Sequence, residues 1–347
     1  MLQGLVAQDS RCSPFAVLGL VGGLFALSPS TVANAEAATL TLYSAQHEQT
    51  VDLLVADFEK ETGIQVRVHT GEGPEVANQL LEEGTDSPAD VYFTENSPEL
   101  MLLEEKGLLA PVMSTTLAQI PSRYNSPHGT WVGVLARENV LAYNTTMIQP
   151  NQLPASLMDL ADPSWKGKVA IAPSDGDFLP LVSAVEALKG KDEALQWLKG
   201  LKANAQIFDD DEGVVAAVNR GSVATGIINN YYWARLKVEV GDAAVNSALY
   251  HFGHGDVGAL INVSGAGVLK TAPYPQAAQR FLAYLVSDRA QQLMAKSNIT
   301  FEYPLRPGVK PDPLLKPFDQ LEPPALDIGK LGDDSDAGAL LQAAGLL

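Results

Sequence analysis

Apolar residues recur with the spacing of β-strands in some segments and of α-helices in others, and the two kinds of segment alternate along the chain. Residues 39–43, 64–69 and 90–93 have the alternation or clustering of short buried strands. Between them, apolar residues recur at helical spacing over 51–58 and 75–83. Strand–helix alternation of this kind predicts an α/β fold with a mostly parallel sheet covered by helices on both faces.

The alternation continues to the end of the chain, with local signals for where helices begin and end. We expect Ser97 to cap a helix that has Pro98 in its first turn and ends at Gly107. Two long extended segments, 131–143 and 259–268, are candidates for strands that cross between two domains. The remaining predicted strands are 167–171, 207–208 and 223–228, and the remaining predicted helices are 179–188, 192–201, 214–218, 275–285, 290–296 and 337–347.

Length and charge narrow the class of protein. A chain of 347 residues is too long for one small core and predicts one or two α/β domains. The net charge of −18 at pH 7 argues against nucleic acid or an anionic membrane surface as a partner. It suits a protein that attracts cations, although a solvated acidic surface gives the same figure.

The first 36 residues have the pattern of a secretory signal peptide. Arg11 precedes an apolar run over 15–27, which is too short to span a bilayer permanently, and small residues follow up to Ala33-Asn34-Ala35. We expect cleavage after Ala35 or a residue or two later, which removes Cys12, the only cysteine. No second apolar stretch approaches membrane-spanning length. The product is therefore expected outside the cytoplasm, without a disulfide and without direct membrane insertion.

Two adjacent tyrosines lie where a buried strand is expected to end and a helix to begin. Tyr231 and Tyr232 follow the apolar run 223–228, and Trp233, Leu236 and Val240 then share one helical face. In open α/β folds, ligands bind at that end of the sheet. At a strand-to-helix turn two neighbouring phenols can fork toward one point, and a hard, highly charged cation is one good reason to place them so.

Two further strand ends carry side chains that can hold a hard metal, His47 and Glu95. Hard cations take oxygen ligands, and imidazole suits iron among others. Free tyrosine has a pKa near ~10, so a phenolate at neutral pH needs a strong Lewis acid such as Fe(III). Two phenolates and one carboxylate balance a 3+ ion, and four ligands leave two places of an octahedron for water or an anion.

Each of these residues also has a simpler interpretation. A histidine at a helix start is more often a surface or capping residue, and Glu95 beside a helix N-terminus is favoured by the helix dipole. Adjacent tyrosines are more often packing or interface residues. The metal hypothesis therefore depends on whether the three turns face one another in the fold.

With these residues laid out, the chain resembles the periplasmic ferric-ion-binding proteins of ABC transporters over nearly its whole mature length. The family's four ligand types match at His47, Glu95, Tyr231 and Tyr232, so the resemblance implies these as iron ligands. It implies second-layer roles for Asn229 and for Arg137, which would face an accessory anion. The segments that carry the resemblance are 43–47, 89–95, 163–168, 228–233 and 302–306.

The resemblance also implies an architecture and a biological setting. It predicts a type II periplasmic binding protein, in which two lobes, each a mostly parallel sheet flanked by helices, are joined by crossing strands and close on Fe(III). The implied partner is an inner-membrane ABC permease, the implied location is the periplasm, and we expect a monomer. The first lobe would comprise 39–137 and 263–312, and the second 138–262 and 313–347, after a signal peptide over 1–36.

One turn departs from the family pattern. Family members with this ligand set usually hold phosphate or carbonate on a serine- and glycine-bearing turn, where this chain has Asp175-Gly176-Asp177. The next loop brings Asp211 where an amide is common. Carboxylates repel an anion, so we hypothesise that Asp175 or Asp177 replaces it, directly or through water. The alternative is that the turn points its acids to solvent.

Other functions fit the sequence less well. A polyamine site needs aromatic faces rather than phenol oxygens, and the acidic turn disfavours an oxyanion. For an enzyme, we find no G-x-S-x-G motif, no H-E-x-x-H motif and no cysteine nucleophile after cleavage. His69, His128, His251 and His254 are not spaced as an obvious zinc set. We therefore expect a binding protein and no catalytic residue.

Overall fold

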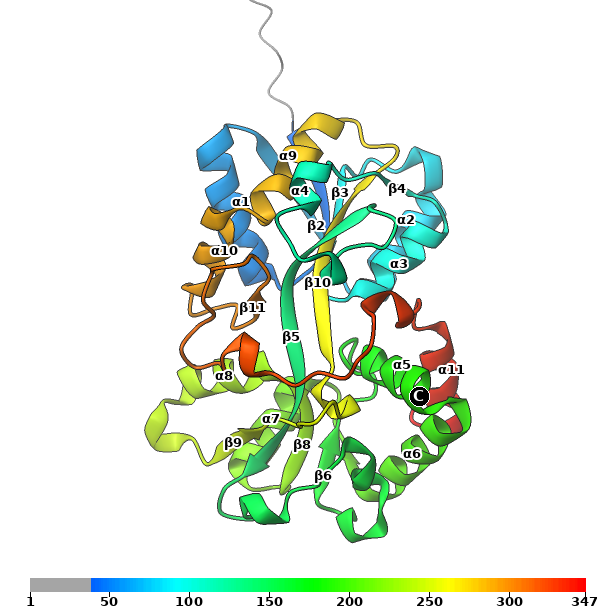
Figure 1. The fold of residues 1–347 in the computed structure, drawn as a ribbon, viewed down its shortest axis with the longest axis vertical. Helices are drawn as coiled ribbons and strands as arrows, with labels where there is room; N and C mark the ends of the chain where they lie inside the picture. Colours follow the sequence, from blue (N-terminus) through cyan, green and yellow to red (C-terminus); the bar gives the residue numbers. More distant parts are fainter. Residues whose placement is uncertain (1–38) are drawn as a thin grey trace, which may run out of the picture. The chain divides into compact units, whose positions relative to one another are not determined.

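The computed structural model describes residues 39–347, and the expected signal peptide with Cys12 lies outside the described residues. Within 39–347 no helix is long and apolar enough to cross a bilayer. The described chain folds into two lobes, drawn as the upper and lower halves of Figure 1, which share a long pair of central strands.

The first lobe is built on parallel strands. β1 (Thr39–Ala45) lies between β2 (Gln65–Thr70) and β3 (Val91–Thr94) and pairs with both in parallel. The short β4 (Leu109–Ala110) pairs with β10 (Ile261–Leu269). The helices of this lobe are α1 (Glu48–Thr62), α2 (Gly73–Glu83), α3 (Ser97–Glu105), α4 (Ser114–Leu117), α9 (Pro275–Leu285) and α10 (Asp288–Ala295).

The second lobe repeats this arrangement with different strands. β6 (Val169–Ile171) lies between β7 (Ala205–Ile207) and β8 (Thr225–Asn229) and pairs with both in parallel. β9 (Ser247–Tyr250) pairs with the central strand β5 (Trp131–Asn144). The helices of this lobe are α5 (Phe178–Lys189), α6 (Lys191–Asn204), α7 (Asp211–Arg220), α8 (Asn230–Val240) and α11 (Ser335–Ala344).

Strands β5 and β10 run between the two lobes, as Figure 1 shows. The first part of β5 pairs antiparallel with β10, which also pairs antiparallel with β3. From Asn139 to Tyr143, β5 pairs with β8 of the second lobe. The continuous order is β2-β1-β3-β10-β5-β8-β6-β7, with β11 (Tyr303–Pro304) pairing β5 near the crossing. The two crossing strands predicted from sequence are therefore confirmed.

Helix α1 shows how the apolar pattern produces the packing. Its buried positions Val51, Leu54 and Phe58 lie on one face, and the Phe58 ring meets Phe281 of α9 edge to face at 5.0 Å. Burial of one such side chain contributes about 1.5–3 kcal/mol. Gly63 ends the helix at φ +72, a conformation that favours glycine. The helix is thereby fixed against the sheet, with its N-terminus at the end of β1.

One predicted helix start is wrong in detail. The N-cap position of α3 is Asn96 rather than Ser97, and no side chain caps the helix there. The reason is that Asn96 accepts a hydrogen bond from Arg137, while the Ser97 hydroxyl donates to Asn262 Oδ1 at 3.1 Å. The short strands β4, β9 and β11 were not predicted, because each is defined by its pairing with β10 or β5, which lie far from it in the sequence.

Candidate functional site

The four predicted ligands lie where strands of both lobes end at the crevice between the lobes. His47 follows β1 and is the N-cap residue of α1, and Glu95 comes directly after β3. Tyr231 and Tyr232 lie in the first turn of α8, after β8. The carboxyl ends of the parallel strands bring side chains of the two lobes to one crevice, as open α/β sheets do.

The structure brings these four side chains together. His47 Nε2 lies 3.1 Å from Glu95 Oε2. The His47 ring meets the Tyr231 ring edge-on, with centroids 5.0 Å apart, and the Tyr231 and Tyr232 rings are 4.2 Å apart. The three turns therefore face one another, which the sequence alone left open. The described structure is a closed arrangement, in which the first lobe's histidine touches the second lobe's tyrosine.

Burial leaves two of these side chains with unsatisfied atoms. Tyr231 is fully buried, Tyr232 is 6% exposed, and the side chains of His47 and Glu95 are 15% and 22% exposed. Within 39–347, His47 Nε2 and Glu95 Oε2 have no hydrogen-bond partner, because their contact is not aligned as a hydrogen bond. A buried polar atom without a partner costs about 1–3 kcal/mol. A cation placed between such atoms would remove that cost.

Electrostatics favour the uncharged forms of the four predicted ligands. Burial first, and then the charge of Arg235, lowers the pKa of His47 to about 3, so its imidazole is neutral and able to bind a metal. Burial raises the pKa of Glu95 well above its usual range, and nearby Asp177 raises it further. Burial and Asp177 also raise the pKa values of Tyr231 and Tyr232. Only a strong Lewis acid displaces such protons at neutral pH.

Behind the tyrosines lies a buried ion-pair network centred on Arg137. Its guanidinium is fully buried, with Nη2 3.3 Å from Asp177 Oδ1 and Nη1 3.4 Å from Glu302 Oε1. Arg137 also donates to Asn96 Oδ1, and the Asn96 amide donates to Asp177 Oδ1 at 3.3 Å. The Tyr231 hydroxyl donates to Asp177 Oδ2 at 2.6 Å. Arg137 thus faces carboxylates of the chain itself.

The acidic turn after β6 points inward, so the solvent-facing alternative is wrong for Asp177, which is 5% exposed. Asp175 accepts hydrogen bonds from the backbone N–H groups of Asp177 and Asp211, each at 3.0 Å. Asp211 in turn accepts from the backbone N–H of Asn229 at 3.2 Å. A Cβ on Gly176 would lie 3.9 Å from the Asn96 amide of the first lobe. Asp175 and Asp211 therefore connect the turn after β6, the start of α7 and the end of β8 through hydrogen bonds.

Sequence reasoning missed three residues beside the site: Asn96, Glu302 and Arg235. The Arg235 guanidinium lies 4.6 Å from the Tyr231 ring centre, and its Nε donates to the Ile299 carbonyl at 3.1 Å. The sequence could have indicated Arg235, because it follows Tyr231 by four positions and residues i and i+4 lie on the same face of a helix. Asn96 and Glu302 lie in segments that the metal hypothesis and the resemblance had already singled out.

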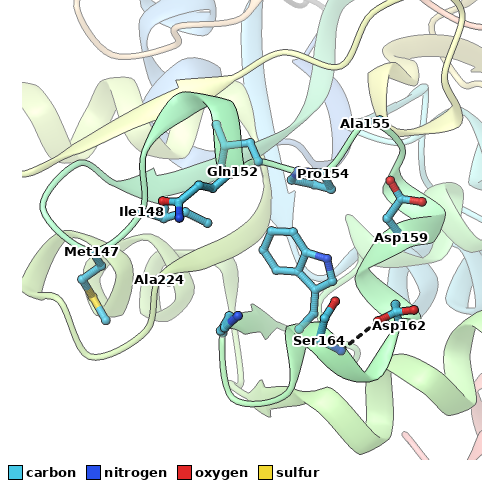
Figure 2. Close-up of a pocket in the computed structure, with 12 residues that line it drawn as sticks. Met147, Ile148, Gln152, Pro154, Ala155, Asp159, Asp162, Ser164 and Ala224 are labelled. Carbon is cyan, nitrogen blue, oxygen red and sulfur yellow. Dashed lines mark hydrogen bonds between the residues drawn. The ribbon is translucent and has the colours of Figure 1, made fainter.

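Two hollows in the surface are lined in part by predicted ligands. One of about 520 Å³ is lined by His47, Arg235, Asn298 and neighbouring residues, and another of about 380 Å³ is lined by Tyr232, Arg235 and Glu212. A hollow of about 700 Å³ in the second lobe is lined by Met147, Asp159 and other residues, none of them a predicted ligand (Figure 2). Of these three hollows, only the two smaller ones are lined by predicted ligands, His47 and Tyr232.

Several buried carboxyls give the apo-protein an unusual dependence of stability on pH. Burial raises the pKa of Asp175 and Glu302 to about 7 and that of Glu99 to about 8. In the unfolded chain such groups titrate near ~4. The stability they contribute is therefore complete below that value and is lost as the pH rises through 7 to 8.

We expect the metal-free protein to melt at a higher temperature at pH 6.5 than at pH 8, by at least roughly 2 °C. Calorimetry in the presence of a chelator measures the difference, and a Glu99→Gln variant should show a smaller one. We compare no pH below 6.5, because burial lowers the pKa of His47 to about 3. Below pH 6.5 this histidine binds a proton more readily in the unfolded chain, which offsets the stability gained from the carboxyls. Equal melting temperatures at the two pH values would contradict the expectation.

Known proteins are similar to this chain in sequence and in fold. Residues 54–321 match the family model described as bacterial extracellular solute-binding protein. The "Fe(3+)-binding periplasmic protein" of Serratia marcescens is 39% identical over 97% of this chain and 99% of its own. The "Major ferric iron-binding protein" of Neisseria meningitidis is 34% identical over 91% of this chain and 96% of its own. Iron-bound HitA from Pseudomonas aeruginosa superimposes with a TM-score of 0.85 at 44% identity, covering 89% of this chain and 99% of HitA.

The fold and the convergent site define a two-lobed binding protein of the type II periplasmic class. The chain belongs to the bacterial extracellular solute-binding protein family. The fold class and the family expected from the sequence are therefore confirmed. These relatives are binding proteins rather than enzymes, which is consistent with the expected class.

Proposed function

We propose that this protein captures Fe(III) in the crevice between its lobes and delivers it to an ABC permease of the inner membrane. The proposed ligands are His47 and Glu95 of the first lobe and Tyr231 and Tyr232 of the second. The observation that carries the proposal is their convergence, with two buried ligand atoms left unpaired. Relatives named as ferric-ion-binding proteins, matched over nearly their whole length, support it.

The donor set favours a ferric ion over softer or less charged metals. Two phenolates and a carboxylate are hard oxygen donors that together neutralise a 3+ ion, and a neutral imidazole completes a set that suits iron. Burial raises the pKa values of Tyr231 and Tyr232 and so favours the protonated phenols. Fe(II) carries less charge than Fe(III) and is therefore less able to displace the two protons. Reduction, protonation of the ligands or opening of the lobes would each release the cargo.

Closure of the lobes follows from the division of the ligands. We assign residues 39–137 and 263–312 to the first lobe and 138–262 and 313–347 to the second, so each lobe contributes two ligands. An ion bound by all four is held only when the lobes are closed. Iron therefore shifts the population toward the closed form by its higher affinity for that form.

The setting of this function rests on the relatives and on the N-terminal sequence. The curated relatives are named as periplasmic or iron-binding proteins. We propose that residues 1–36 direct export and are removed, that the mature protein is a periplasmic monomer, and that it performs no catalysis. Asn229 and Arg137 would support the ligands from behind.

Adding Fe(III) to the apo-protein tests the function. Iron supplied as ferric nitrilotriacetate should produce an orange-red band, because phenolate-to-iron charge transfer absorbs visible light. About three protons should leave for each iron bound, because burial raises the pKa values of Tyr231, Tyr232 and Glu95 and so favours their protonated forms before iron is added. A pH-stat measures the protons after correction for the released chelator.

The variant Tyr231→Phe/Tyr232→Phe, which lacks both phenol oxygens, is titrated in the same way and gives the background proton release. A colourless wild-type product, or one that releases no more protons than this variant, would refute the proposal. A polyamine-binding protein or a zinc enzyme would give that result.

A further inference from the structure

Asn230 is a fully buried polar residue beside the proposed ligands. It is the first residue of α8 and directly precedes Tyr231 and Tyr232. Both ends of its side-chain amide are engaged. Oδ1 accepts a hydrogen bond from the backbone N–H of Glu138 at 2.8 Å, and Nδ2 donates to the carbonyl of Phe301 at 3.1 Å. A buried amide that is bonded at both ends has one fixed orientation.

The contact with Glu138 extends the sheet by one residue. In the antiparallel pairing of β5 with β8, Asn139 lies opposite Asn229, so the next pair would be Glu138 with Asn230. The backbone instead turns into α8 at Asn230. Because a buried N–H group requires an acceptor, the Asn230 amide takes the place of the missing backbone partner. Since Glu138 also pairs with Ile261 of β10, the start of α8 is tied to the point where β5 changes its pairing partner.

The contact with Phe301 reaches the segment 297–301, which we assign to the first lobe. Asn298 and Phe301 of this segment have φ values of +55 and +49, a conformation that persists only where surrounding contacts fix it. On the next turn of α8, Arg235 Nε donates to the carbonyl of Ile299 at 3.1 Å. Helix α8 is therefore hydrogen-bonded at two points to a segment with an uncommon backbone conformation.

The same segment also contacts the helix whose N-cap residue is His47. The hydroxyls of Thr300 and of Thr50 on α1 are 3.3 Å apart, and both side chains are fully buried. Within the segment, Ser297 Oγ accepts hydrogen bonds from the backbone N–H groups of Ile299 and Thr300 at 3.1 and 3.2 Å. Hydrogen-bonded groups other than the proposed ligands thus connect the ligand-bearing helices of the two lobes.

We propose that Asn230 is a positioning residue for the ferric ion: held between β5 and the segment 297–301, it sets where the two phenols of α8 stand relative to the ligands of the first lobe. This inference rests on the proposed function. Metal ligands have to be held within about 0.5 Å of their productive positions, and the residue that precedes two of them fixes where their backbone begins. Because the segment 297–301 belongs to the first lobe, the placement of the phenols depends on the position of that lobe.

A simpler role for Asn230 would be to satisfy buried polar groups, as Asn144 does at the far end of β5. Asn144 is 1% exposed, its Nδ2 donates to the Val218 carbonyl at 2.8 Å, and its Oδ1 accepts from the Thr146 N–H at 3.0 Å. Neither partner adjoins a predicted ligand. Loss of either amide should lower the stability of the protein, but only loss of the Asn230 amide should alter the iron site.

The test compares Asn230→Ala with Asn144→Ala, each titrated with ferric nitrilotriacetate. Both variants should melt at a lower temperature than the wild type, since each leaves buried backbone groups unpaired. Asn230→Ala should also bind iron about 10- to 100-fold more weakly and show a shifted charge-transfer band, because the phenols change position. Asn144→Ala should keep the wild-type affinity and band. Competition with nitrilotriacetate measures the affinity, and visible absorption measures the band.

Asn230→Asp replaces Asn230→Ala in this comparison if circular dichroism shows that the alanine variant is unfolded. It keeps the shape and the acceptor for the Glu138 N–H, but it cannot donate to the Phe301 carbonyl, so its band should shift as well. A folded Asn230→Ala with the wild-type band and affinity would overturn the inference, and so would an unshifted band in Asn230→Asp.

An equal shift of the band in Asn230→Ala and Asn144→Ala would also overturn the inference, because the effect would then follow from lost stability alone. All of these results leave the proposed function intact, because iron is still bound. The absence of any band in the wild-type protein would instead refute the proposed function itself.

Discussion

The variant Tyr231→Phe/Tyr232→Phe should fold normally and remain colourless with ferric iron. Both rings are buried and lie 4.2 Å apart, so phenylalanine preserves the packing and removes only the two oxygens. Those oxygens provide two of the three negative charges among the four ligands. We expect the affinity for Fe(III) to fall by at least about 1,000-fold, which corresponds to about 4 kcal/mol.

Competition with nitrilotriacetate, followed by absorption and by iron analysis after gel filtration, measures that loss. A matched control is Tyr250→Phe/Tyr274→Phe, which removes two phenol oxygens from partly exposed residues away from the site and should leave the band unchanged. Each single variant at Tyr231 or Tyr232 should retain a weaker band. If the double variant binds iron as tightly as the wild type, the phenols are packing residues and the proposed site is wrong.

The fold was largely predictable because its signals are local. Helix α1 needed only the spacing of Val51, Leu54 and Phe58, and its end needed only Gly63. The long strand β5 was visible as a long extended segment, 131–143, with no helical period. The pairing of β5 with β8 and β9 was not predictable, because that pairing depends on contacts between residues far apart in the sequence.

The residues of the proposed site could be named from the sequence, but their geometry could not. His47, Glu95 and the tyrosines were identified from strand ends and from family resemblance, whereas their convergence depends on how the lobes close. Asp177 shows the same limit: its sequence allowed a solvent-facing turn, and only the position of Arg137 on β5 decides that it points inward. The tyrosine variants test only the second lobe, so the first lobe's contribution needs an experiment of its own.

The variant His47→Ala/Glu95→Ala should still show a charge-transfer band with iron, but its two lobes should no longer close around the ion. Both phenolates remain on the second lobe, so charge transfer persists, although the band should shift and the affinity should fall on the order of 100-fold, about 2.7 kcal/mol. The first lobe then contributes no ligand and gains nothing from closure. Small-angle X-ray scattering should show compaction by iron in the wild-type protein and none in the variant.

A matched control is His69→Ala/Glu75→Ala, which removes the same side-chain types from exposed positions of the first lobe and should compact as the wild type does. If the His47→Ala/Glu95→Ala variant still compacts with iron, closure is driven by other contacts between the lobes. The Arg235–Ile299 hydrogen bond and the Arg137–Glu302 pair beside the site would then be the first to examine. If the variant loses all colour, the second lobe cannot hold iron alone, and the ion enters only when both lobes are already in place.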